Sequence, residues 1–96
     1  MGSVKEVMLE LGKRPTEKNW KAFSLKLQRS SIRYYRIIFT GKRGSSRGED
    51  LEKSYVELYD AGHRGAGTVP LFVKEDGKIR GATAYLKGLG RYGKVI

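Results

Sequence analysis

The sequence lacks cysteine altogether and contains one histidine, one asparagine, one glutamine and two prolines. Without cysteine the chain has no disulfide framework, no thiolate zinc site and no cysteine nucleophile. The single histidine, His63, excludes any site built on two or more imidazoles. Scarcity of Asn, Gln and Cys beside many charged residues is typical of thermophilic proteins. Bases nevertheless outnumber acids by 20 to 10, and adaptation to heat does not explain that imbalance.

Long apolar runs are also missing. The longest contain three or four residues, as at Val7 to Leu9, and the N-terminus has no hydrophobic segment of the kind found in secretory signals. The sequence therefore predicts a cytoplasmic protein that does not span a membrane. Its 96 residues predict a single domain, residues 1–96, with one modest core.

The positive charge that is present is concentrated in one stretch. Residues 13–47 contain eleven Lys or Arg and a single acid, Glu17, so this stretch carries a net charge of +10, equal to that of the whole chain. Such a field attracts polyanions, because each neutralised phosphate releases condensed counterions. The sequence therefore predicts nucleic acid as the partner, and this attraction does not distinguish RNA from DNA.

Two helices are predicted at the N-terminus. Ser3 and Glu6 have the spacing of a capping box, and apolar residues recur at helical spacing up to Leu11, which predicts a helix over about 3–12. A second helix is predicted from Thr16, as its N-cap, to about Arg29. The short connection predicts that the two helices are neighbours in an αα-hairpin.

From residue 31 onward the apolar pattern is that of strands, rich in β-branched and aromatic residues. The Asp76-Gly77 pair predicts a tight hairpin turn, and Pro70 belongs at a strand start or on an edge because it cannot donate to a ladder. The strands are predicted at Ile32–Thr40, Ser54–Tyr59, Thr68–Val73 and Ile79–Leu86.

This order predicts an α+β fold in which two N-terminal helices pack on a small, mostly antiparallel sheet of three or four strands. Alternation along the first strand directs Tyr35, Ile37 and Phe39 toward the core. The opposite face then carries Tyr34 and Arg36, and a wet face of this composition is a platform on which unpaired bases stack. The alternative is that the tyrosines cover the core and expose their hydroxyls alone.

The second helix carries cations with few acidic partners. Glu17 can pair with Lys21, whereas Lys18, Lys26 and Arg29 have no acid four residues earlier. We expect these cations to contact phosphate, and the alternative is an ordinary solvated helix face.

Two further segments are basic and rich in glycine. Residues 41–50 are predicted to form a flexible loop, and residues 87–96 a tail. Residues 88–93, GLGRYG, match GxGxxG, but the chain ends three residues later, with neither the helix nor the acid of a dinucleotide site. We therefore expect no cofactor.

Catalysis has two candidate groups. His63 and Arg64 have the chemistry of a base and a phosphate clamp in a metal-independent ribonuclease, although a histidine in this glycine-rich setting is more typical of a turn. The acids Glu49, Asp50, Glu52, Glu57 and Asp60 have the ligand chemistry of Mg²⁺, and equally balance the basic surface. We expect no catalytic residue and no metal.

The leading hypothesis is a non-enzymatic RNA-binding protein, such as a ribosome-associated or other ribonucleoprotein component. The alternatives are a DNA-binding protein, either a chromatin protein or a viral or plasmid regulator, and then a ribonuclease. The sequence leaves the oligomeric state open. The predicted nucleic-acid contacts are Lys13, Arg14, Lys18, Lys21, Lys26, Arg29, Arg33, Tyr34, Arg36, Lys42, Arg43, Arg47, Lys87, Arg91, Tyr92 and Lys94.

Overall fold

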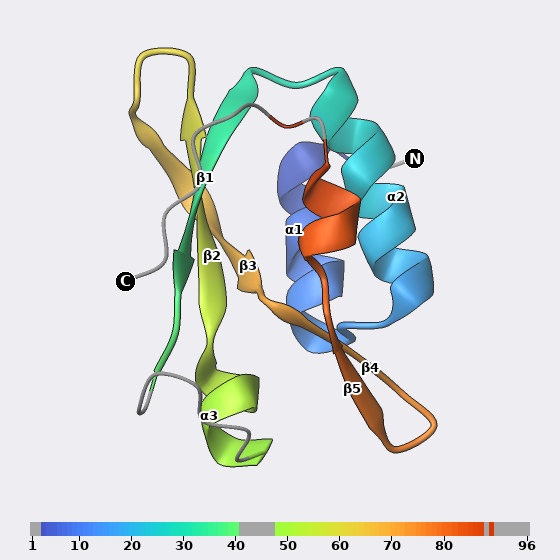
Figure 1. Ribbon diagram of the computed structural model, residues 1–96. Coiled ribbons are helices and arrows are strands. Elements are labelled where there is room, and N and C mark those ends of the chain that lie inside the picture. The colour runs from blue at the N-terminus through green and yellow to red at the C-terminus, as the bar shows by residue number, and fades with distance from the viewer. Residues whose placement is uncertain (1–2, 41–47, 88, 90–96) are drawn as a thin grey trace.

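Two helices, a three-stranded sheet and a separate β-hairpin make up most of the fold, which was obtained as a computed structural model (Figure 1). The structure describes residues 3–40, 48–87 and 89. The predicted α+β arrangement is confirmed. The elements are α1 (Val4–Lys13), α2 (Glu17–Gln28), β1 (Ile32–Ile38), α3 (Gly48–Lys53), β2 (Tyr55–Asp60), β3 (Gly65–Pro70), β4 (Phe72–Glu75), β5 (Lys78–Gly81) and the 3-10 helix η1 (Thr83–Leu86).

Both N-terminal helices begin at the predicted caps. The Ser3 Oγ accepts a hydrogen bond from the backbone N–H of Glu6 at 3.3 Å, and the Thr16 Oγ1 accepts one from that of Asn19 at 3.2 Å. Each cap satisfies a donor that would otherwise lack a partner in the first turn. None of the helices in the described part of the chain is long and apolar enough to cross a membrane.

The sheet is antiparallel in the order β1-β2-β3, and both helices lie on the same side of it (Figure 1). α1 approaches β3 closely at Gly67, which has φ +126°. A Cβ at this position would collide with the terminal methyl of Met8. The backbone conformation therefore favours glycine here, and an added Cβ would also displace the flexible end of the Met8 side chain.

The core lies between the helices and the sheet. The helices contribute Leu11, Trp20 and Phe23, which are fully buried, and β2 contributes Val56 and Leu58. On β1 the predicted alternation is confirmed for Tyr35 and Ile37, which pack in or against this core. It is wrong for Phe39, which is 40% exposed. β1 ends at Ile38, so Phe39 has left the sheet, and its ring packs edge-on to Phe72 at a centroid distance of 6.1 Å.

The C-terminal half differs from the prediction in its strand boundaries. The expected strand over 68–73 is two strands, because the chain crosses from one sheet to the other at Leu71. The Leu71 N–H donates to the carbonyl of Ser54 at 3.2 Å, whereas its carbonyl accepts from Ala82 at 2.8 Å. The expected strand over 79–86 ends at Gly81, and η1 follows. Pro70 lies at the end of the edge strand β3, as predicted.

The predicted hairpin turn is confirmed. Asp76 and Gly77 join β4 to β5 with φ values of 51° and 71°, the left-handed conformation that this pair of residues favours. The expected loop over 41–50 is shorter than predicted at its C-terminal end, since α3 begins at Gly48. The rest of that expected loop, 41–47, lies outside the described residues.

Ser54 joins several of these elements at a buried position, with 1% of its surface exposed. Its Oγ donates to the carbonyl of Asp50 at 2.6 Å and accepts from the N–H of Thr40 at 3.2 Å. A buried hydroxyl with both functions satisfied fixes the end of β1 against α3.

Candidate nucleic-acid interface

Five of the predicted contact residues in the helical hairpin make no ion pair with any acid in the described part of the chain, and neither does Lys5 of α1. All five are exposed except Lys26, which is half-buried. Lys26 and Arg29 line a groove together with Glu6 and Glu10, but none of the five cations is within ion-pair distance of a described carboxylate, so their charge is available to an anion in solution. They are Lys13, Arg14, Lys18, Lys26 and Arg29.

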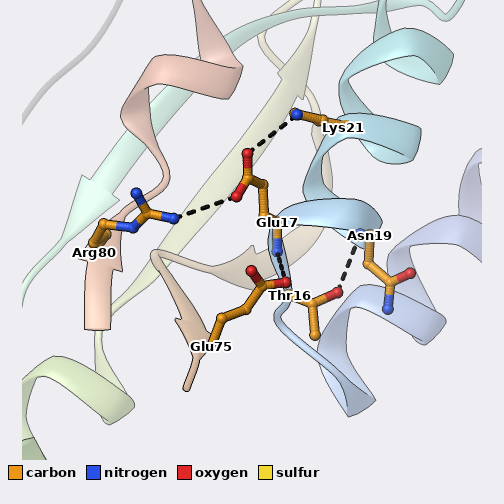
Figure 2. A network of polar contacts seen from close by, with 6 residues as sticks. All are labelled: Thr16, Glu17, Asn19, Lys21, Glu75 and Arg80. Atoms are coloured by element: carbon orange, nitrogen blue, oxygen red, sulfur yellow. Dashed lines mark hydrogen bonds and ion pairs between the residues drawn. The ribbon is translucent and has the colours of Figure 1, made fainter. Parts of the chain in front are cut away.

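Lys21 behaves differently, because Glu17 is its partner (Figure 2). The Lys21 Nζ lies 3.1 Å from Glu17 Oε1, and the Nη2 of Arg80 lies 3.3 Å from Glu17 Oε2. The hydrogen bond and charge of Lys21 lower the pKa of Glu17, and Glu17 raises the pKa of Lys21 in return. The pairing of Glu17 with Lys21 predicted from the sequence is thus confirmed, and Lys21 is already partly neutralised.

The same network fastens the β4–β5 hairpin to the start of α2. The Glu75 Oε1 accepts the backbone N–H of Glu17 at 3.1 Å (Figure 2). The N–H of Lys74 donates to the carbonyl of Pro15 at 2.6 Å. A carboxylate at a helix N-terminus is favoured by the helix dipole. Glu17 and Glu75 therefore have structural partners within the fold.

The outer face of the sheet, on the side away from the helices, carries aromatic side chains from two strands. Residues directly opposite on antiparallel strands share a face, and the register pairs Tyr34 with Tyr59, and Ile38 with Tyr55. All four are half-buried. Tyr34 and Tyr59 are therefore direct neighbours on this face, whereas Tyr55 lies beyond the Arg36–Glu57 pair, four residues along β2 from Tyr59.

Arg36 occupies the middle of this outer face and pairs with Glu57, its direct neighbour on β2. The Arg36 Nε lies 3.3 Å from Glu57 Oε1. These two atoms are buried and make no hydrogen bond within the described residues, so the ion pair is the contact that compensates their burial. Arg36 therefore adds less positive field to this face than its formal charge indicates.

His63 lies in the turn between β2 and β3 with φ 60°. Its ring stacks on Tyr34 at a centroid distance of 4.4 Å and an interplanar angle of 10°. The turn is fixed by Asp60, whose Oδ1 accepts the N–H groups of Gly62 at 2.9 Å and Arg64 at 3.0 Å. The histidine thus extends the aromatic pair of Tyr34 and Tyr59 beyond the strands.

A third group forms where α2 ends and β1 begins. Arg33 and Lys87, which are 54 positions apart in the sequence, both line a concavity of about 450 Å³ together with Gln28. Arg33 falls at the register shift of β1, and its Nη1 donates to the carbonyls of Ser30 and Ile32. This bonding directs Arg33 toward the helix side rather than onto the outer face with Tyr34.

The structure therefore brings the predicted site residues together in three groups rather than one surface. The hairpin cations and the outer face belong to opposite layers, and the concavity lies at the end of the molecule where the chain passes from one layer to the other (Figure 1). The remaining predicted contacts lie outside the described residues; they are Lys42, Arg43, Arg47, Arg91, Tyr92 and Lys94.

Sequence reasoning missed several members of these groups. Tyr59 was not among the predicted contacts, although alternation along the second strand already places it on the face opposite to Val56 and Leu58; the β1–β2 register sets it beside Tyr34. No sequence pattern predicts the position of Gln28 in the concavity or the stacking of His63 on Tyr34, because the residues that contact each other come from distant parts of the chain.

The candidate acidic residues that the structure describes, which do not include the side chain of Glu49, do not assemble into a metal site. In the ranges 3–40, 48–87 and 89, no three acidic or histidine side chains come together as potential metal ligands. Comparison with protein-family models, curated proteins and solved structures finds no match to this chain. A functional assignment therefore depends on the three groups described above.

Proposed function

We propose that the protein is a non-enzymatic RNA-binding protein, of the kind that forms part of a ribosome or another ribonucleoprotein particle. The hairpin cations contact phosphate, and the outer face of the sheet receives unpaired bases. The cytoplasmic location stays a prediction from the sequence.

The observation that carries this proposal is the number of cations without an ion pair on the helical hairpin. Elsewhere the pattern is mixed: Lys74 has Glu52 at 3.1 Å and Arg80 has Glu17 at 3.3 Å, whereas other exposed cations such as Lys53 and Lys78 make no ion pair among the described residues. The five hairpin cations have none among the described residues, although seven acids lie between residues 48 and 87. Cations left unpaired in this way repel one another, and a polyanion relieves that repulsion.

RNA is favoured over DNA by the outer face of the sheet. Tyrosine rings on adjacent strands offer flat surfaces to bases that are free to unstack, as they are in single strands and loops. A DNA duplex keeps its bases stacked inside the helix, so only the contacts between its phosphates and the cations contribute to its affinity. The proposal therefore separates two contributions, phosphate attraction from α1–α2 and base stacking from β1–β2.

A salt titration tests the proposal. Binding of a single-stranded RNA oligonucleotide should weaken steeply as salt rises; for about six phosphate contacts, log K against log salt should have a slope of roughly −4 to −5. A matched DNA duplex with the same number of phosphates should bind with a similar slope and lower affinity. Flat salt dependence would contradict the electrostatic part, and tighter binding of the duplex would make DNA the partner.

A second measurement addresses the ribonuclease alternative. If the protein binds without cleaving, RNA stays intact during incubation with the wild type and with His63→Ala alike. The affinity of His63→Ala should stay within about 1 kcal/mol of the wild type, the usual contribution of one polar contact. Metal-independent cleavage that disappears in His63→Ala would make the protein an enzyme.

A further inference from the structure

The concavity at the junction of α2 and β1 has a floor and a rim of different chemistry. Its floor contains Leu27 and Ile32, each 3% exposed, and Leu89, which is 8% exposed. Its rim carries Gln28, Arg33 and Lys87, all of them exposed. Because the floor residues are almost wholly buried, most of the surface that a ligand would contact in this concavity is polar. Its volume of about 450 Å³ lies within the usual range of small-molecule sites.

The charge of this concavity favours an anion. None of the described residues that line it is acidic. A second, larger concavity of about 830 Å³ lies between α1 and α2, and its lining includes Glu6 and Glu10. That groove is also lined by Lys26 and Arg29, so its acidic and basic side chains balance. The described lining of the smaller concavity has two bases, Arg33 and Lys87, and no acid, so the smaller concavity has the larger net positive charge.

Arg33 is held in place before any ligand binds. Its Nη1 donates to the carbonyl of Ile32 at 2.8 Å and to that of Ser30. These bonds occupy one nitrogen of the guanidinium group and leave its other N–H groups for a phosphate oxygen. A pre-ordered donor loses little side-chain entropy when the ligand arrives.

We propose that this concavity binds one unpaired RNA nucleotide. The base rests on the floor of Leu27, Ile32 and Leu89, the phosphate meets Arg33 and Lys87, and the Gln28 amide hydrogen-bonds the edge of the base. This inference rests on the proposed RNA binding and deepens it. A strand passing from the hairpin cations to the outer face of the sheet crosses the molecule at this end, so the concavity connects the two surfaces.

A titration with uridine 5′-monophosphate tests the subsite directly. We expect millimolar nucleotide to shift the backbone amide NMR signals of Gln28, Arg33 and Lys87 together, and inorganic phosphate to shift the latter two less at the same concentration. Lys87→Ala should weaken nucleotide binding about five- to tenfold, as expected for one lost charged contact. Lys78→Ala is the matched control, since Lys78 is also exposed and lies at the far hairpin. It should leave nucleotide binding unchanged.

Three results would overturn the subsite. The nucleotide could shift signals scattered over the whole basic surface, phosphate alone could reproduce its effect, or Lys78→Ala could weaken binding as much as Lys87→Ala. In each case, RNA oligonucleotides that still bind with steep salt dependence would leave the proposed function in place. RNA that does not bind at any salt concentration would instead refute the function itself.

Discussion

The helical hairpin and the outer face of the sheet differ in whether their cations form ion pairs. On the hairpin, Lys18 and Arg29 have no acidic partner within the described residues. On the outer face, Arg36 lies directly opposite Glu57 and pairs with it at 3.3 Å. Internal pairing reduces the field that a polyanion experiences, so the hairpin is the electrostatic surface and the sheet is the aromatic one.

This contrast shows that the number of basic residues in a segment does not tell how many of them are free to bind phosphate. Lys21 and Lys18 lie three residues apart on α2, yet Glu17 partly neutralises the first and not the second. Substitutions can test this difference between the hairpin and the outer face. The first disrupts the contact between helix and sheet, and the next ones remove a stacking side chain, a free cation and a member of an ion pair.

The largest effect should come from the contact that joins the two regions. Gly67→Ala adds a Cβ that collides with Met8 and strains the backbone at φ +126°. We expect a loss of about 2 to 3 kcal/mol in the free energy of unfolding, chiefly from backbone strain, measured by urea denaturation. In the Met8→Ala background the same substitution should cost less, because the collision is gone. Equal costs in both backgrounds would show that α1 does not press on β3 at this point.

The next effect concerns the aromatic surface. Tyr34→Ala should weaken single-stranded RNA by about 1 to 3 kcal/mol, the usual value of a lost base stack, and leave duplex DNA nearly unchanged. Tyr34→Phe keeps the ring and should bind RNA like the wild type, which makes it the matched control. If Tyr34→Ala unfolds the protein, circular dichroism will show it, and the tyrosine is then part of the core. If it folds and weakens RNA and duplex DNA equally, the stacking surface is refuted.

A smaller effect separates free from paired cations. Lys18→Ala should reduce the slope of log K against log salt by about 1, because it removes one phosphate contact. Lys21→Ala should reduce it less in the wild type, since Glu17 already compensates this charge. In Glu17→Gln, Lys21 becomes free, and the two alanine substitutions should then have equal effects. Equal effects in the wild type would show that the ion pair does not limit phosphate binding.

The smallest effect is on the acid stability of the Glu17 network. Lys21 lowers the pKa of Glu17 below its ordinary value of 4.5. The ionised carboxylate therefore stabilises the fold above that value, and this contribution is lost as pH falls through the lowered pKa. The midpoint of thermal unfolding should fall less between about pH 7 and about pH 3 in Glu17→Gln than in the wild type. An identical fall in both proteins would remove Glu17 from the acid response.

Local signals in the sequence identified most of the fold. The caps Ser3 and Thr16 and the turn at Asp76-Gly77 depend on neighbouring residues, so their spacing was sufficient. Where the chain crosses between sheets the prediction was wrong, because a run of β-forming residues has the same local pattern whether its hydrogen bonds go to one sheet or two. The Leu71 N–H donates to the carbonyl of Ser54, and the Leu71 carbonyl accepts from the N–H of Ala82. Both partners are more than ten residues away in the sequence.

The candidate interface was less predictable for the same reason. The charge of residues 13–47 and the outward position of Tyr34 followed from composition and alternation. The pairing of Arg36 with Glu57 depends on strand register, and the meeting of Arg33 with Lys87 depends on how η1 packs beside α2. Register and packing are set by contacts between segments far apart in the chain, which local sequence patterns do not specify.

The most direct test of the central claim is an amide NMR map of two titrations, one with single-stranded RNA and one with a DNA duplex carrying the same number of phosphates. The account predicts that both ligands shift the signals of Lys18 and Arg29 on α2, and that RNA alone also shifts those of Tyr34, Tyr55 and Tyr59 on the outer face. Identical maps confined to α2 would contradict it, because the sheet would then take no part in binding.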